Sequence, residues 1–368
     1  MKKLISALLI FASLSAVSCS LVELREADTG TVAVPETTAP PETTAPAQTT
    51  ETTEVTTEPE PVRETFQIKL SFAGDNLLAS FMDETKALNF NDFVNKNPSS
   101  YFLEKVKHIF EADDFSIVNL ENVFTDKDLE IIEKGYTPAY WYKTRTSNID
   151  ILTTSSIEGV SLANNHTADY GDEGYNDTIE TVKNAGLYYG TSSEIMYLEK
   201  DGFRIAVICT GLWNEYQAKF VNSMVDKAEE QSDYQIVFFH GGTERIHEPE
   251  EWKINACRNI VDNGADLVLG GHPHVLQPME NYNGVDIVYS LGNFCFGDGY
   301  RPENRTVIYR MDLTIDKETM TVSEESSTII PCYLYTGDRN NYQPAVIEDE
   351  AEKNKVLDFM NRKCDSPV

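Results

Sequence analysis

Histidine, acidic and asparagine side chains recur at the ends of apolar segments of this sequence. The densest group is Gly271-His272-Pro273-His274, and Asp75, Glu121, Asn165 and His240 each lie at or just beyond the end of an apolar run elsewhere in the chain. Carboxylate oxygens and neutral imidazole nitrogens are the donors that divalent transition metals prefer. The pattern predicts a metal-centred active site for one or two ions of Mn, Fe or Zn. Two ions would need a bridging carboxylate, either Asp75 or Glu121.

The elements that must position these residues alternate between apolar, β-branched segments and amphipathic ones. Such alternation predicts an α/β fold in which helices cover the sheets, and one domain is the simplest organisation. In α/β sheets ligands bind at the carboxyl ends of strands, so the polar residues are expected to face one crevice. The predicted strands are 66–72, 115–120, 159–162, 203–209, 235–239, 266–269 and 286–289; the predicted helices are 101–111, 173–184 and 249–263; and a hairpin is predicted at 306–315 and 319–323.

Several of these residues also have an ordinary structural interpretation. Asp75 could cap a following helix and Asn165 could belong to a turn, and only their combination with the histidines favours metal binding. Asn293 is interpreted as either a turn residue or a substrate contact. Glu244 is either a surface acid or a carboxylate that orients a ligand histidine. His108 and His247 are expected to be ordinary surface or hydrogen-bonded groups.

Six motifs, taken in order, resemble the bacterial capsule-synthesis CapA family, also called the poly-γ-glutamate capsule biosynthesis family. The resemblance covers about residues 66–296, and the motifs occupy 73–75, 119–121, 162–166 with 169–171, 240–242 with Glu244, 271–277 and 290–294. The family looks like a branch of the calcineurin-like metallophosphoesterases. The resemblance therefore implies a two-sheet sandwich flanked by helices.

The resemblance also implies roles for individual residues. Asp75 and His274 would bind a first metal, Glu121 would bridge two metals, and His166 would donate a proton to the leaving oxygen as a general acid. Substrate contact, or support of the ligands, is expected of Asn164, Glu244 and Asn293. The second metal would be bound by Asn165, His240 and His272.

Two positions depart from the phosphoesterase pattern. The first motif of phosphoesterases is Asp-x-His, but here Leu77 stands where the histidine would be, so the first metal loses an imidazole. The bridging position carries Glu121 instead of aspartate, and its longer side chain changes the spacing between the metals. These departures leave the second set of ligands intact.

The N-terminal part has the composition of an export signal followed by a tether. Lys2-Lys3 and a short apolar run predict a signal peptide at residues 1–18, and the lipobox-like sequence 16–19 predicts lipidation of Cys19. Simple secretion or an uncleaved anchor are the alternatives. Residues 19–65, rich in Thr, Pro and Glu, are predicted to be a disordered linker. We therefore expect an extracytoplasmic domain at 66–340, anchored to the bacterial membrane by lipid, and a C-terminal tail of undetermined structure at 341–368.

Charge and cysteine content limit the partners. The formal net charge is −30, so nucleic acid is not an expected partner. The five cysteines beyond Cys19 have no CxxC spacing, and buried free thiols are the expected state. The expected partners are an anionic or peptide-like cell-surface polymer and membrane proteins of polymer synthesis.

Two functions are compatible with the sequence. The first is a surface-anchored, metal-dependent hydrolase or transferase acting on a polymer or a phosphoester. The second is a non-catalytic component of a capsule or poly-γ-glutamate synthesis and export complex, whose metal site is degenerate because residue 77 is leucine.

Overall fold

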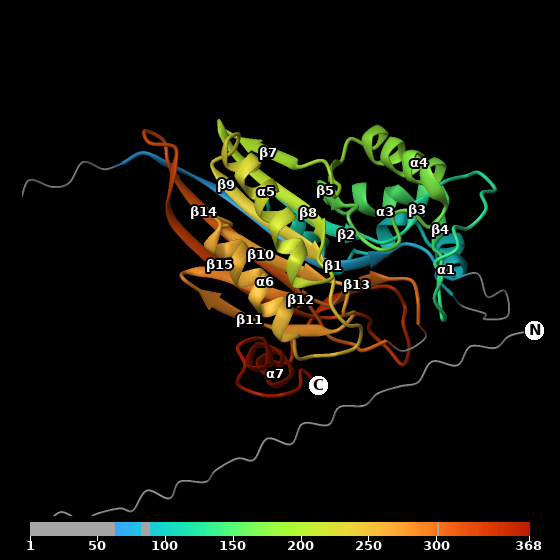
Figure 1. The fold of residues 1–368 in the computed structure, drawn as a ribbon. Helices are drawn as coiled ribbons and strands as arrows, with labels where there is room; N and C mark the ends of the chain where they lie inside the picture. The colour runs from blue at the N-terminus through green and yellow to red at the C-terminus, as the bar shows by residue number, and fades with distance from the viewer. Residues whose placement is uncertain (1–62, 82–88, 300–301) are drawn as a thin grey trace, which may run out of the picture. The chain divides into compact units, whose positions relative to one another are not determined.

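The computed structural model describes residues 63–81, 89–299 and 302–368. The predicted signal peptide, Cys19 and almost all of the predicted linker lie outside these residues. Within residues 61–368 the chain forms one compact unit built on two sheets (Figure 1).

The first sheet has eight strands in the order β16-β15-β14-β1-β2-β5-β6, and β13 also pairs with β1. The central strand β1 is parallel to β2 and β13 and antiparallel to β14. The strand bounds are β1 (Thr65–Leu77), β2 (Phe115–Leu120), β5 (Gly159–Ser161), β6 (Tyr188–Gly190), β13 (Asn293–Phe296), β14 (Thr306–Asp316), β15 (Thr321–Tyr333) and β16 (Ala345–Val346).

The second sheet has six strands in the order β11-β12-β10-β9-β8-β7. Its inner strands are parallel, and an antiparallel strand closes each edge. The strand bounds are β7 (Met196–Lys200), β8 (Phe203–Gly211), β9 (Tyr234–His240), β10 (Leu267–Gly271), β11 (Leu276–Tyr282) and β12 (Val285–Leu291). A separate parallel pair is formed by β3 (Val123–Phe124) and β4 (Lys143–Thr144).

The main hydrophobic core lies between the two sheets. Alternate residues of β1, such as Leu70 and Phe72, are fully buried against side chains of the second sheet, such as Ile236 and Phe238. The rings of Phe72 and Phe238 meet edge to face with 5.7 Å between centroids. Residues two apart on a regular strand point the same way, but the register between β1 and β2 shifts between Ala73 and Asp75, so this alternation is interrupted just before Asp75.

Helices cover the outer faces of both sheets. α5 and α6 pack on the second sheet through residues such as Val221, Val225 and Ile260, and Figure 1 shows them side by side over its strands. A further core between the first sheet and other helices includes Phe90 and Val182. The helix bounds are α1 (Phe90–Lys96), α2 (Lys107–Phe110), α3 (Asp150–Thr153), α4 (Gly171–Asn184), α5 (Ala218–Glu229), α6 (Glu251–Asp262) and α7 (Glu350–Met360), with 3-10 turns η1 (Ser99–Tyr101), η2 (Thr146–Ile149) and η3 (Glu215–Gln217).

The observed elements confirm the α/β sandwich flanked by helices and correct one helix. The segment predicted as a helix over 101–111 contains only η1 and the single turn α2, joined by non-helical turns. Its apolar residues, including Phe102, Leu103 and Phe110, are nevertheless buried. In this segment the spacing of apolar residues reflects which side chains are buried, and a series of tight turns buries them as well as a helix would.

The C-terminal residues, for which the sequence predicted no structure, are folded onto the sandwich. β16 pairs with β15, and Val356, Phe359 and Met360 of α7 are buried in the core between the sheets. In the described residues no helix is both long and apolar enough to cross a membrane. Cysteines 209, 257, 295, 332 and 364 are free, and the first four of them are buried.

Candidate metal centre

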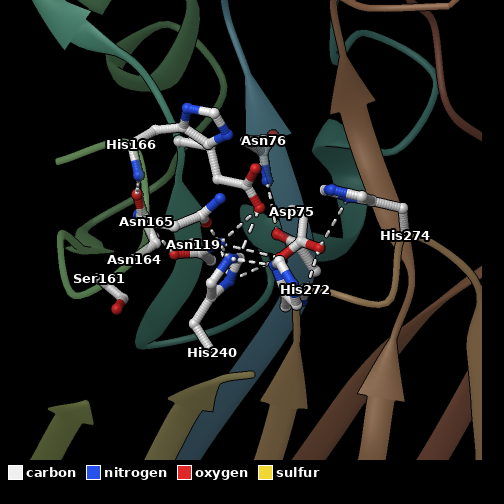
Figure 2. A network of polar contacts seen from close by, with 12 residues as sticks. Asp75, Asn76, Asn119, Ser161, Asn164, Asn165, His166, His240, His272 and His274 are labelled. Carbon is white, nitrogen blue, oxygen red and sulfur yellow. Dashed lines mark hydrogen bonds and ion pairs between the residues drawn. The ribbon is translucent and has the colours of Figure 1, made fainter. Parts of the chain in front are cut away.

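The two sheets meet where β1 and β10 end, and the predicted ligands gather at this junction. Asp75 on β1 accepts a hydrogen bond from the backbone N–H of His272 (2.9 Å), and its own N–H donates to the carbonyl of Gly292 (2.9 Å). Gly271 permits the approach, because a Cβ added there would lie 2.4 Å from Asp75 Oδ1. Figure 2 shows the side chains of both sheets converging on Asp75. Its place within β1 rules out the alternative role as a helix cap.

Asp75, Glu121 and His240 form a fully buried group of donors. Their ligating atoms lie within 4.8 Å of one another, and each side chain is at most 2% exposed. His240 Nδ1 lies 3.6 Å from Asp75 Oδ1 and 3.7 Å from Glu121 Oε1. Two carboxylates and an imidazole in a buried space match the preferences of a divalent transition metal.

Asn119 lies at the centre of this group, although the sequence did not single it out as a site residue. Its Nδ2 donates to Asp75 Oδ1 (2.8 Å) and Glu121 Oε1 (3.1 Å) and lies 3.1 Å from His240 Nδ1. The available signal was its position on β2, two residues before Glu121 and paired in register with Asp75. The partial positive charge of an amide N–H₂ group faces two carboxylates here.

The electrostatics of the two carboxyl groups fit a bound cation. Burial favours a raised pKa at Asp75, but hydrogen bonds and charge from His240 and His274 outweigh it and hold the pKa well below its usual value. Burial, followed by repulsion from Asp75, raises the pKa of Glu121 well above its usual value. Among the described residues, Glu121 Oε2 is buried without a hydrogen-bond partner. A divalent ion would let both groups ionise and would occupy the unused oxygen, so these residues fit a metal.

A second group of donors lies on the outer side of the first. Ligating atoms of Glu244, His272 and His274 fall within 4.8 Å of one another, with Glu244 exposed and His274 partly buried. His272 Nδ1 is 3.1 Å from His240 Nε2, so the two groups are adjacent. The resemblance implies another division, which pairs His272 with His240 and His274 with Asp75, and His274 Nδ1 does lie 3.4 Å from Asp75 Oδ2. The ligands of each individual ion stay a prediction.

The asparagines of the third motif reach the buried group. Asn165 Oδ1 is 2.8 Å from His240 Nε2, and Asn164 Nδ2 donates to Asn119 Oδ1 (3.1 Å) and to the carbonyl of Leu120 (2.8 Å). Both asparagines precede α4, in the loop after β5, and are labelled in Figure 2. The structure thus places Asn165 beside a predicted ligand and uses Asn164 to hold this loop against β2.

His166 belongs to a polar network with Asp169 and Lys134. Its Nδ1 lies 2.9 Å from Asp169 Oδ2 and 3.3 Å from Lys134 Nζ, and Lys134 Nζ is 2.5 Å from Asp169 Oδ1. Burial lowers the pKa of His166, and the interaction with Asp169 only partly offsets it. The sequence did not identify Lys134, which lies in an irregular segment between β3 and β4 and carries no pattern of its own.

Asn293 and Leu77 define the remaining side of the site. Asn293 Oδ1 lies 2.9 Å from His274 Nδ1, so Asn293 holds this histidine in place. Leu77 is fully buried and packs in an apolar cluster with Tyr142 and Phe296. The Phe296 ring in turn contacts the His274 ring, with 4.9 Å between centroids.

A cavity of about 420 Å³ opens beside the outer donors. Its lining includes His166, Glu244, Arg245, His274 and Asn293, but none of the three residues of the buried group. A molecule in this cavity would therefore meet His166 and the outer donors first. Larger hollows of the described surface lie over other elements and contain none of the predicted site residues.

The ring of Trp213, a residue that the sequence analysis did not single out, packs against two of the histidines. The Trp213 ring meets the ring of His272 edge-on at 4.8 Å and that of His240 at 5.9 Å. Trp213 follows β8, so it comes from a third strand end at the same junction. The two histidines interpreted as ordinary lie apart from this junction: His108 is exposed, and His247 is bonded to Glu303 and to the carbonyl of Leu276.

Comparison with known proteins finds relatives of this chain in two Bacillus species. The PGA biosynthesis protein CapA of Bacillus subtilis is 30% identical over 264 residues, which are 64% of this chain and 67% of that protein. The capsule biosynthesis protein CapA of Bacillus anthracis is 24% identical over 325 residues, 81% of this chain and 74% of that protein.

A solved phosphatase structure from Mycoplasma pneumoniae covers 73% of this chain and 95% of its own, at 14% identity and a TM-score of 0.45. A TM-score this low does not establish a common fold. The family model described as bacterial capsule synthesis protein PGA_cap matches residues 69–298, which contain all of the donors described above. This chain therefore belongs to the bacterial capsule synthesis family PGA_cap, the family of the CapA proteins of poly-γ-glutamate biosynthesis.

Proposed function

We propose that this protein is a metal-dependent hydrolase or transferase that acts on an anionic, peptide-like polymer of the capsule or poly-γ-glutamate class. The observation that carries the proposal is the buried group Asp75, Glu121 and His240, adjacent to a cavity lined by His166. A capsule polymer is the substrate class that fits the relatives' names, both of which concern capsule or PGA biosynthesis.

The metal would be bound by Asp75, Glu121 and His240, with Asn165 beside His240. When bound, a divalent ion of this kind polarises a scissile group and lowers the pKa of water. Asp169 holds His166 through Nδ1, which leaves Nε2 as the nitrogen available to move a proton in the cavity. Lys134 neutralises Asp169 and keeps that pair together.

The cavity also has the means to receive an anionic chain. Three acidic residues line the cavity. Glu303 is paired with His247, and Asp298 accepts a hydrogen bond from Tyr142. Glu244 lies with the outer histidines. Arg245 adds a guanidinium group to the wall, which suits a carboxylate or phosphate.

The proposed location is the outer face of the cell membrane, with Cys19 carrying the lipid. The support is the charged and apolar sequence of residues 1–19 together with the Thr, Pro and Glu composition that follows. Labelling of living cells with a fatty-acid analogue, comparing the natural chain with Cys19→Ala, tests this directly. Equal labelling of the two chains would remove the anchor from the proposal.

The direct test of the metal centre is metal content and turnover of the purified full chain. Elemental analysis after exposure to Mn, Fe and Zn is expected to find bound metal, lost in His240→Ala and kept in His108→Ala, which changes an exposed histidine. Poly-γ-glutamate shortening and hydrolysis of a model phosphodiester are the assays of turnover. His166→Asn is expected to keep the metal and lose turnover. Absence of metal at micromolar concentrations would overturn the proposal.

A second candidate function rests on Leu77. Because an apolar cluster occupies this position, the protein could instead be a non-catalytic component of a polymer synthesis and export complex. The expected sign is bound metal without turnover of either substrate, together with co-purification of membrane proteins of polymer synthesis. Robust turnover by the isolated chain, with no such membrane partner recovered, would exclude it.

A further inference from the structure

On the side of the site nearest Leu77 the side chains are apolar, and their carbon atoms cannot bind a metal ion. Asp75 and Leu77 are two residues apart at the end of β1. Leu77 is fully buried with Tyr142, Phe296 and neighbouring apolar residues. The Phe296 ring lies against His274. A ligand that completes the coordination of an ion near His274 must come from another direction.

The loop after β9 supplies a carboxylate oxygen near both histidines. Glu244 lies in this loop, and its carboxylate falls within 4.8 Å of ligating nitrogens of both His272 and His274. None of these three side chains belongs to the buried group of Asp75, Glu121 and His240. The described residues therefore contain two adjacent sets of three donors, and His274 Nδ1 lies 3.4 Å from Asp75 Oδ2 where the sets meet.

Backbone contacts hold Glu244 in this position. The next residue, Arg245, donates its N–H to the carbonyl of Pro273 (2.8 Å), within the turn that carries both histidines. On either side, Gly241 N–H donates to the carbonyl of Gly271 (3.1 Å) and the Gln277 amide donates to the carbonyl of Ile246 (2.7 Å). The loop thus runs along the His-Pro-His turn and holds the exposed Glu244 carboxylate beside both histidines.

The outer set also faces the cavity. Glu244 and His274 line it together with His166, while the buried donors do not. An ion bound by the outer set would therefore be the one in contact with a substrate, and the buried ion would lie behind it. His272 Nδ1, 3.1 Å from His240 Nε2, connects the two sets.

We infer that Glu244 is a direct ligand of a second, cavity-facing divalent ion, which it binds together with His272 and His274, and that it supplies the donor that Leu77 lacks. The inference rests on the proposed metal centre. It assigns His272 to the outer ion and changes Glu244 from a supporting residue into a ligand.

The test counts ions. Full chain stripped with a chelator is titrated with Mn²⁺ by calorimetry and by equilibrium dialysis with elemental analysis. The natural chain is expected to bind two ions. Glu244→Gln is expected to keep the buried ion and to bind the second one at least about 10- to 100-fold more weakly. Glu244→His, which restores a donor, is expected to recover it.

Matched controls keep the result interpretable. Glu248→Gln removes an exposed acid four residues away in the same loop, one paired with Arg362, and is expected to bind two ions normally. Circular dichroism checks that each variant is folded, which is expected because Glu244 is exposed. The electron paramagnetic resonance signal of bound Mn²⁺ is expected to change from that of a coupled pair to that of an isolated ion in Glu244→Gln.

Each outcome decides between distinct statements. If the natural chain binds no ion, both the proposed function and this inference fail. If it binds one ion, or if Glu244→Gln binds two ions as tightly as the natural chain, only this inference fails. Loss of one ion in Glu244→Gln and its recovery in Glu244→His would establish the outer site.

Discussion

Replacing Asn119 by aspartate tests whether the amide of this residue offsets the negative charge of the buried group. Asn119 Nδ2 has two protons and faces Asp75 Oδ1, Glu121 Oε1 and His240 Nδ1 at 2.8 to 3.1 Å. Asn119→Asp keeps the shape and the acceptor used by Asn164 but turns the donor into a carboxyl oxygen. Without a cation, this carboxyl would have to stay neutral or be repelled by the two acids.

The magnitude follows from the cost of that protonation. An unfolded aspartate has a pKa near 3.9, so keeping it neutral in the folded protein costs about 4 kcal/mol at pH 7 and about 1.5 kcal/mol at pH 5. A neutral carboxyl group donates only one hydrogen bond, whereas the amide donates two. The lost hydrogen bond to a charged group contributes about 1.5–3 kcal/mol. The two costs together give an expected loss of about 5.5–7 kcal/mol in the free energy of unfolding at pH 7.

The sign of the pH dependence is fixed by the same reasoning. The folded pKa of the new carboxyl lies above the unfolded value, so its stability contribution is complete below about pH 4 and is lost as the pH rises through the folded pKa. The deficit should therefore be larger at pH 7 than at pH 5. In Mn²⁺ the new carboxylate becomes an additional donor, and the deficit should shrink.

The assay is urea unfolding of the full chain, followed by far-ultraviolet circular dichroism, at pH 5 and pH 7, with chelator or with Mn²⁺. Asn176→Asp, on the exposed surface of α4, is the control and should change stability by less than about 0.5 kcal/mol. A chelated Asn119→Asp as stable as the natural chain at pH 7, or a deficit that does not depend on pH, would refute the reasoning.

Two further predictions concern the support of the site. Gly271→Ala should cost about 1–3 kcal/mol of stability and weaken metal binding, because the new Cβ would lie 2.4 Å from Asp75 Oδ1. The control is Gly159→Ala, whose new Cβ meets the flexible Met196 side chain. Unfolding and metal titration compare the two variants, and equal effects would contradict the steric argument. The hydrogen bond to Glu303 raises the pKa of His247, so the stabilising effect of this bond is complete below about pH 6.5 and is lost as the pH rises through the folded pKa. Glu303→Gln should therefore destabilise the protein by about 1 kcal/mol at pH 6 and by much less at pH 9. Unfolding experiments measure both values, and an equal loss at the two pH values would argue against this pairing.

The fold was largely predictable from the sequence because apolar alternation is a local property. The predicted strands from 66 to 289 all correspond to observed strands, and the hairpin of β14 and β15 is confirmed. Local patterns missed burial without regular structure, at 101–111, short or edge elements such as β11 and β16, and the amphipathic helix α5. α7 was missed because its apolar residues are few, and it is placed by its contact with a core formed by distant strands.

The site shows the same division between local and distant information. The donors Asp75, His240, His272 and His274 could be named because each lies at or just beyond the end of an apolar run, a relation that is visible along the chain. Asn119 could not be ranked above other asparagines, since its role depends on distances to residues 44 and 121 positions away.

The sequence by itself determined the donor chemistry, the alternation of strands and helices, and the family to which the motifs belong. Only the tertiary structure decided which donors lie together. It brought Glu244 beside His272 and His274, filled the side of Leu77 with apolar groups, and placed Lys134 and Asp169 behind His166. The physical reason is that strand ends from two different sheets meet at one junction, and the distances across that junction are set by packing between the sheets, which no local pattern records.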